Sequence, residues 1–145
     1  MQILGRNERP LTVLLVEDTE DNRFMMRRLL EMSGYHVIEA VNGQEAIWLA
    51  GEQRPQVILM DLSLPIVDGL AATRQIRSLP DLRKVPIIVV SAHDTADFHK
   101  EALAAGCDAY ITKPIDYAEL EGLISRILAR RNQVSQHNDH NDALA

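Results

Sequence analysis

Short apolar runs of strand length recur along the chain. Four of them are rich in β-branched residues and span residues 12–16, 57–60, 86–90 and 109–112. This length and composition favour β-strands. The second and third of these runs have no polar alternation, which is typical of parallel strands covered on both faces. A fifth run, residues 36–40, is interrupted by Glu39 and predicts an edge strand.

Helical periodicity fills the segments between these runs. Apolar residues spaced three or four apart include Met25, Met26, Leu29 and Leu30, then Ala72, Ile76 and Leu79, and finally Leu120, Leu123, Ile124, Ile127 and Leu128. Each set places one apolar face on a helix. Gly34 predicts the end of the first helix, residues 53–55 predict the end of the second, and Asp116 is the expected N-cap of the last.

Strict alternation of strands and helices predicts the fold class. Five strands and five helices with short connections favour an α/β, doubly wound parallel sheet. At 145 residues with 46% hydrophobic content, the chain suffices for one core. We expect an N-terminal extension at 1–10, one domain at 11–131, and a disordered polar tail at 132–145, which is rich in Asn, Asp, His and Gln.

Charge and composition exclude several classes of protein. A net charge of -6 argues against direct nucleic-acid binding, which needs clustered Lys and Arg. No apolar run approaches the roughly 20 residues of a membrane span. We therefore expect a soluble, unexported, cytoplasmic protein. The single cysteine, Cys107, cannot form an internal disulfide and is interpreted as a small buried apolar residue.

Polar side chains follow four of the predicted strands. Glu17 and Asp18 follow the first strand, Asp61 the third, Ser91 the fourth, and Thr112 and Lys113 the fifth. In open parallel sheets the carboxyl ends of the strands form the binding edge. Three carboxylates are expected to converge there, and their repulsion favours a bound cation. Ligation by oxygen alone indicates Mg²⁺, with Mn²⁺ as the alternative, rather than zinc.

This predicted site suits phosphoryl transfer, which depends on positioning and on charge neutralisation. Asp61 is the nucleophile candidate because it follows an apolar central strand, and carboxylates form acyl phosphates. Lys113 would contact one phosphoryl oxygen as a point charge. Ser91 would donate a hydrogen bond to another.

Five motifs in order resemble those of response-regulator receiver domains. They are Val-Glu-Asp at 16–18, Leu-Met-Asp-Leu-Ser-Leu-Pro at 59–65, Asp-Gly at 68–69, Val-Ser-Ala at 90–92, and Ala-Gly-Cys-Asp-Ala-Tyr-Ile-Thr-Lys-Pro at 105–114. The resemblance covers residues 11–131. It implies a flavodoxin-like five-stranded sheet of strand order 2-1-3-4-5, with five helices.

The resemblance also implies a role for each acidic residue. Asp61 would be the phosphoacceptor. Mg²⁺ would be bound by Asp18, Asp61 and the backbone carbonyl of Ser63. Glu17 would act through a metal-bound water.

Further roles are implied at the last two strands. Ser91 and Tyr110 would form a switch pair. Lys113 would contact the phosphoryl group, and its bond to Pro114 would be cis. The family varies at the positions of Ser63 and His93, which tune dephosphorylation, so no lifetime follows from the sequence.

The function implied is that of a phosphorelay response regulator. A sensor histidine kinase or a histidine phosphotransfer protein would phosphorylate it, and it would assist this reaction and its reversal without being an enzyme that acts on other substrates. The face of the fourth helix, fifth strand and fifth helix, at 95–105, Tyr110 and 117–129, would engage a downstream protein or form a phosphorylation-dependent homodimer. No nucleic-acid or membrane partner is expected.

Three alternatives stay open at this point. A phosphatase of the haloacid dehalogenase type expects an acid two residues after the nucleophile, where this chain has Ser63. A receiver module of a hybrid histidine kinase, acting as a phosphate relay or sink, fits the stretch 16–23, although Met1 and the tail favour a free-standing protein. A pseudo-receiver that only binds partners is disfavoured by the intact set of site residues.

Several side chains also have a purely structural interpretation. Glu17 and Asp18 alone would suit the N-terminus of a helix. Trp48 is expected to be partly exposed, as ordinary rim packing. His137 and His140 lie in the polar tail, where no rigid frame would hold a metal. Arg23, Phe24, Arg27 and Arg28 suit either a docking helix or a charged solvent face.

Overall fold

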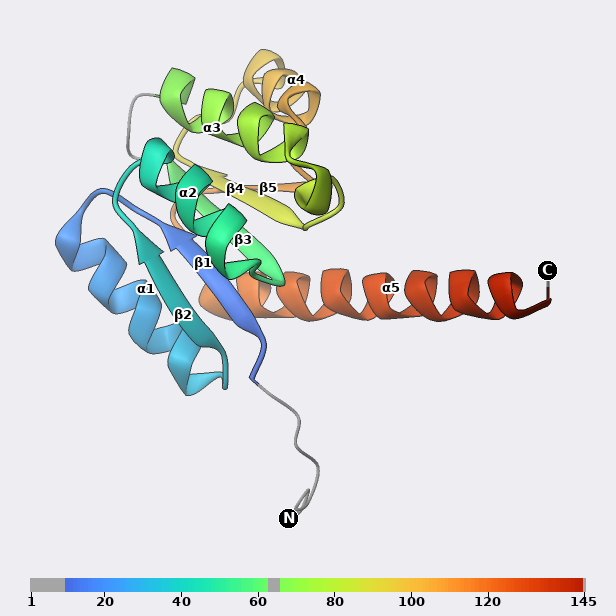
Figure 1. Ribbon diagram of the computed structural model, residues 1–145. Coiled ribbons are helices and arrows are strands. Elements are labelled where there is room, and N and C mark those ends of the chain that lie inside the picture. Colours follow the sequence, from blue (N-terminus) through green and yellow to red (C-terminus); the bar gives the residue numbers. More distant parts are fainter. Residues whose placement is uncertain (1–9, 63–65, 145) are drawn as a thin grey trace.

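Five strands alternate with five α-helices over the residues that the computed structural model describes, 10–62 and 66–144 (Figure 1). In chain order they are β1 (Thr12–Val16), α1 (Glu20–Met32), β2 (His36–Ala40), α2 (Gly43–Gln53), β3 (Val57–Leu62), α3 (Ile66–Ser78), the 3-10 helix η1 (Pro80–Leu82), β4 (Ile87–Ser91), α4 (Ala96–Ala105), β5 (Ala109–Thr112) and α5 (Tyr117–Leu144). The predicted alternation is confirmed.

The strands form one parallel sheet in the order β2-β1-β3-β4-β5. Helices α1 and α5 cover one face, and α2, α3 and α4 cover the other (Figure 1). This is the doubly wound arrangement that the sequence predicts, with β2 at one edge. All five strands therefore end at the same edge of the sheet.

The central strands carry the core. Side chains of residues 57–61 in β3 and of β4 alternate between the two faces, and all of these are buried. Toward α2, α3 and α4 point Ile58, Met60, Ile87 and Val89, and toward α1 and α5 point Val57, Leu59, Ile88 and Val90. Full burial of such a side chain stabilises the fold by about 1.5–3 kcal/mol. Burial on both faces therefore holds these two strands firmly in the sheet.

The helix ends follow the predicted signals. Gly34, just after α1, adopts a φ of 96°, a left-handed conformation that costs glycine little. The Asp116 carboxylate accepts hydrogen bonds from the amides of Ala118 (3.0 Å) and Glu119 (3.3 Å), so it caps α5. Helix α2 ends on Arg54 with a φ of 47°, so a non-glycine residue takes the left-handed position there.

The first helix departs from the predicted apolar face at one residue. Met26 and Leu30 are buried, whereas Met25 is 57% exposed. Adjacent helical residues point about 100° apart, so Met25 and Met26 cannot both face the sheet. The prediction that Trp48 is exposed is confirmed, at 63%.

The last helix differs from the expected disordered tail. Its backbone stays helical to Leu144, through most of residues 132–145. No Gly or Pro follows Gly122, and extending a helix that has already formed is easier than starting one. Residues 1–9 of the predicted N-terminal extension lie outside the described residues. The boundaries of the 11–131 domain stay a prediction.

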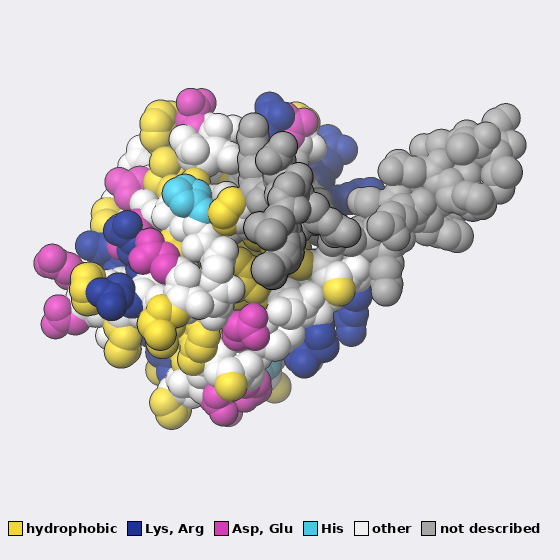
Figure 2. Space-filling view, turned by 90° about the horizontal axis from the view of Figure 1, so that it is seen from below, with side chains coloured by type: hydrophobic (Ala, Val, Ile, Leu, Met, Phe, Trp, Pro, Cys, Tyr) yellow, Lys and Arg dark blue, Asp and Glu magenta, His cyan; other side chains and the backbone are white. Residues whose placement is uncertain are grey.

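Two further expectations concern burial and charge. Cys107 is buried, as predicted, and burial raises the pKa of its thiol to about 11. On the face seen in Figure 2, acidic and basic side chains are interspersed rather than gathered by sign. Within the described part of the chain, no helix has the length and apolar character to cross a membrane.

Candidate functional site

Asp61 stands at the carboxyl end of β3, in register with Val90 of β4. Its side chain is almost fully buried, and Nζ of Lys113 lies 2.7 Å from Oδ1. Among the described residues, no hydrogen bond of regular geometry satisfies this buried oxygen. The ammonium therefore balances the charge of Asp61, although its contact with Oδ1 does not have regular hydrogen-bond geometry.

The pKa of the Asp61 carboxyl is raised above its usual value. Burial is the largest cause, because it disfavours the charged form. Hydrogen bonding to Lys113 and the charge of Lys113 oppose the shift, and the charge of Asp18 adds to it. Additional positive charge beside Asp61 would favour its ionised form.

Glu17 and Asp18 follow β1 at the same edge. Glu17 is fully buried, and its amide donates to the carbonyl of Ala40 in β2 (3.0 Å). Asp18 is exposed and is near enough for its charge to affect Asp61. The two strand ends thus bring Asp18 and Asp61 together.

The predicted metal-binding set of three carboxylates stays a prediction. Over the described residues, no group of three or more Asp, Glu, His or Cys side chains is placed to hold a metal ion. The group that lies against Asp61 among the described side chains is the Lys113 ammonium. The predicted backbone ligand, Ser63, lies outside the described residues.

Ser91 and Tyr110 contact the same residue of the loop after β4. Ser91 is buried, and its Oγ accepts a hydrogen bond from the His93 amide (3.1 Å). The Tyr110 hydroxyl donates to the His93 carbonyl. The two predicted switch residues are therefore joined through one backbone unit.

The Tyr110 ring is half-buried among aromatic side chains of α4. Phe98 meets it edge-on at 5.6 Å, and His99 lies against it at 4.0 Å between ring centroids. Burial is the main cause that raises the pKa of Tyr110, and a hydrogen bond with Ser91 opposes the shift. Tyr110 thus links β4, α4 and β5.

The backbone fixes Lys113 at the end of β5. Its amide donates to the carbonyl of Ser91 (2.8 Å). The Lys113–Pro114 peptide bond is cis, which confirms that expectation. The fifth strand and the following turn therefore position the Lys113 ammonium next to Asp61.

A cavity of about 310 Å³ opens beside Asp61 and Lys113. Its other walls come from α1 and from the segment after β5, namely Asn22, Met25, Met26, Leu29, Pro114, Ile115 and Tyr117. The sequence patterns did not predict this cavity. The one available signal was that Met25 and Met26, as neighbours, cannot both belong to the core face.

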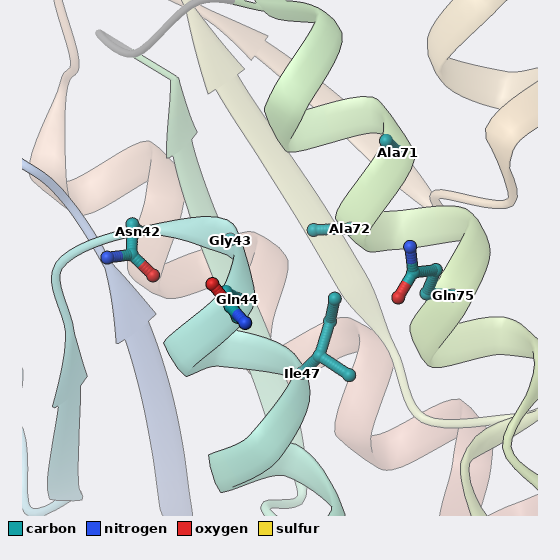
Figure 3. Close-up of a pocket in the computed structure, with 7 residues that line it drawn as sticks. All are labelled: Asn42, Gly43, Gln44, Ile47, Ala71, Ala72 and Gln75. Atoms are coloured by element: carbon teal, nitrogen blue, oxygen red, sulfur yellow. The ribbon is translucent and has the colours of Figure 1, made fainter.

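A second hollow, of about 420 Å³, lies between α2 and α3 (Figure 3). Apart from Ile47, the residues that line it are small or carry a side-chain amide, namely Asn42, Gly43, Gln44, Ala71, Ala72 and Gln75. None of the predicted site residues borders it. The chemistry of the strand ends is therefore concentrated around Asp61.

Comparison with known families decides the family of the chain. The model of the response regulator receiver domain matches residues 13–125. The chain belongs to this family. It is a signalling domain of two-component systems rather than a classical enzyme, and the phosphatase alternative is set aside.

Relatives of this receiver domain agree with the assignment. It is 44% identical over 106 residues to the polar-differentiation response regulator DivK of Brucella anthropi, covering 73% of this chain and 86% of that protein. The receiver domain of a sensor histidine kinase from Pseudomonas aeruginosa, solved with a magnesium ion in its active-site cleft, is 36% identical, with a TM-score of 0.76 over 83% of this chain and 99% of its own. The chemotaxis protein CheY4 of Vibrio cholerae is 26% identical, with a TM-score of 0.77 over 82% and 99%.

Proposed function

We propose that this receiver domain accepts a phosphoryl group on Asp61 from a histidine kinase or a histidine phosphotransfer protein. The observation that supports Asp61 is its buried carboxylate at the end of a central strand, paired with Lys113 at 2.7 Å. Rigid placement of the nucleophile and of a cation lowers the barrier to phosphoryl transfer.

The proposed step is a displacement at phosphorus. A carboxylate oxygen of Asp61 forms the new P–O bond while the P–N bond of a phosphohistidine breaks. The departing imidazole nitrogen keeps the electron pair of that bond and takes a proton from solvent. Lys113 contacts a phosphoryl oxygen, and the Ser91 hydroxyl donates a hydrogen bond to another. Attack by water later releases inorganic phosphate and restores Asp61.

Mg²⁺ is the proposed cofactor, with Mn²⁺ as the alternative. Asp18, Asp61 and the backbone carbonyl of Ser63 would hold the ion, with Glu17 in support. The buried Asp61 Oδ1, which lacks a regular hydrogen bond, and the all-oxygen donor set fit such an ion. When bound, the ion supplies positive charge that offsets the phosphoryl oxygens.

Phosphorylation is proposed to act through Ser91 and Tyr110. The new phosphoryl oxygens attract the Ser91 hydroxyl, which at present accepts from the His93 amide. The Tyr110 hydroxyl donates a hydrogen bond to the His93 carbonyl. A movement of the loop after β4 would therefore also move the Tyr110 ring and change the α4-β5-α5 face. A downstream protein, or a second copy of the chain, would recognise the changed face.

Location and context belong to the same proposal. We place the domain in the cytoplasm, where phosphodonor proteins of two-component systems act. Similarity to a response regulator and to a receiver of a sensor kinase supports both a regulator and a relay module. Phosphotransfer to and from purified candidate partners would separate these roles.

Borohydride trapping after treatment with acetyl phosphate and Mg²⁺ tests the phosphoacceptor. Mass spectrometry should locate the label on Asp61 and find none in Asp61→Asn. A full level of label in that variant, or label on Glu17, would refute the role of Asp61. Omission of Mg²⁺ should suppress labelling of the wild type.

A further inference from the structure

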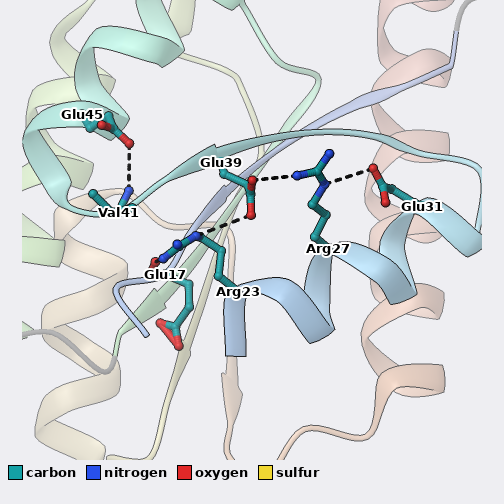
Figure 4. Close-up of polar contacts among 7 residues, drawn as sticks. All are labelled: Glu17, Arg23, Arg27, Glu31, Glu39, Val41 and Glu45. Atoms are coloured by element: carbon teal, nitrogen blue, oxygen red, sulfur yellow. Dashed lines mark hydrogen bonds and ion pairs between the residues drawn. The ribbon is translucent and has the colours of Figure 1, made fainter. Parts of the chain in front are cut away.

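The guanidinium group of Arg23 connects α1 to two strand ends (Figure 4). Its Nη1 donates to the backbone carbonyl of Glu17 (3.0 Å), and its Nε lies 3.4 Å from Oε1 of Glu39 in β2. The side chain is only 17% exposed. Arg23 therefore ties the end of β1 to the edge strand, beside the acidic pair.

This bond fixes a particular peptide unit. The Glu17 carbonyl and the Asp18 amide belong to one planar group, so the direction of the carbonyl sets the position of the Asp18 Cα. On its other side, Glu17 is held by the hydrogen bond that its backbone amide donates to the carbonyl of Ala40 (3.0 Å). The two contacts together orient the start of the β1–α1 loop.

Local contacts within this loop are weak. Thr19 is the N-cap of α1 but makes no side-chain capping bond. Its hydroxyl lies 3.5 Å from Oδ1 of Asp18, at the limit for a hydrogen bond. Arg23 thus supplies an anchor that the capping residue does not.

A neighbouring arginine provides a natural comparison. Glu39 shares its second oxygen with Nη1 of Arg27 (2.9 Å), and Nε of Arg27 pairs with Glu31 (3.1 Å) (Figure 4). Arg27 has the same charge and the same partner in β2. In the described contacts it donates to Glu39 and Glu31 but not to the Glu17 carbonyl, so it shares the ion-pair network without that bond.

We propose that Arg23 is a positioning residue for the cation site. Its bond to the Glu17 carbonyl holds the Glu17–Asp18 peptide in the orientation that lets Asp18 and Asp61 share Mg²⁺. This inference rests on the proposed function and adds a residue to it that does not touch the ion. Glu39 offsets the charge of Arg23, which limits its repulsion of the ion.

The test compares Arg23→Ala and Arg23→Lys with Arg27→Ala. Lysine keeps the charge but not the planar fork, so it separates geometry from electrostatics. Mg²⁺ titrations followed by NMR should show affinity reduced about tenfold in both Arg23 variants, a loss typical of groups that orient metal ligands. Without Mg²⁺, the Asp18 and Thr19 amides should exchange hydrogen faster in both. Arg27→Ala should match the wild type in both measurements.

Each contrary result has a definite meaning. Wild-type affinity and exchange rates in both Arg23 variants would overturn the positioning role. An equal loss of Mg²⁺ affinity in Arg27→Ala would also overturn it, because the effect would then depend on the positive charge of α1 and not on the bond to the Glu17 carbonyl. If Arg23→Ala fails to fold, Arg23→Lys carries the test under the same criteria. A wild-type protein that binds no Mg²⁺ and accepts no phosphate would instead refute the proposed function.

Discussion

Asp61 places a carboxylate where water hardly reaches, and this has a measurable effect on stability. Because its pKa is raised, the folded state binds the proton more tightly than the unfolded state, whose reference value is 3.8. Stability therefore falls as the pH rises from 3.8 through the raised folded-state pKa. Above that window, the ionised buried group opposes folding.

Replacing Asp61 by Asn should therefore stabilise the protein at neutral pH. The gain should disappear as the pH falls below 3.8, where both states of the wild type are protonated. Urea unfolding with EDTA present, compared at pH 7 and pH 3.5, measures this difference. A gain that is the same at both pH values would contradict the role of ionisation.

The neighbouring acid gives a second prediction at the same scale. Asp18→Ala and Asp61→Ala should each weaken Mg²⁺ binding by more than about 100-fold, beyond the roughly 10–100-fold effect that is usual for groups outside the ligand shell. Isothermal titration measures the affinity. Asp21→Ala, on the exposed first turn of α1, is the matched acidic control. Wild-type affinity in both site variants would exclude them as ligands.

Between elements, Arg77 joins α3 to the turn before β5. Its side chain donates to the carbonyls of Gly106 (2.8 Å) and Leu82 (3.2 Å) and pairs with Asp108 (2.6 Å). The Asp108 carboxylate also accepts a hydrogen bond from the backbone amide of Ile87 at the start of β4 (2.8 Å). Arg77 thus joins α3 to the segments that precede β4 and β5, at the end of the sheet opposite to Asp61.

Arg77→Ala should lower the free energy of unfolding by about 2 kcal/mol, because it leaves partly buried acceptors without a donor. Asp81→Asn is the control, since its ion pair with Arg54 is 65–70% exposed and should matter by less than about 1 kcal/mol. Chemical denaturation of both variants tests the contrast. Equal losses would show that burial does not distinguish these two ion pairs.

The loop between β4 and α4 supports a prediction about signalling. Addition of beryllofluoride and Mg²⁺ should perturb NMR signals from Asp61 through His93 to Tyr110 and α4. Ser91→Ala should interrupt this path while leaving the signals nearest Asp61 responsive. Perturbations that never reach Tyr110 in the wild type would leave Asp61 as a relay or sink without this switch.

At the scale of the whole molecule, most of the architecture was predictable. Burial in the sheet produces the apolar runs of the strands, and packing against the sheet produces the apolar faces of the helices. The strand order came from the family resemblance, and the edge position of β2 from Glu39. The continuation of α5 to Leu144 was not predictable from composition. A polar composition indicates that a segment is not buried, but it does not show whether an adjoining helix continues through that segment. The role of Arg23 was hidden, since its bond is to a backbone carbonyl and leaves no side-chain pattern.

The burial of Cys107 gives the protein an intrinsic reporter of opening. It is the only cysteine in the chain, it is 7% exposed, and its thiol has a pKa raised to about 11, so a folded molecule offers almost no thiolate to an alkylating reagent. Labelling at neutral pH then counts the molecules that have transiently opened. Cys107 lies between Gly106 and Asp108, and Arg77 binds both of these residues. The rate of alkylation therefore measures, without any denaturant, how strongly the Arg77 contacts oppose opening of this segment.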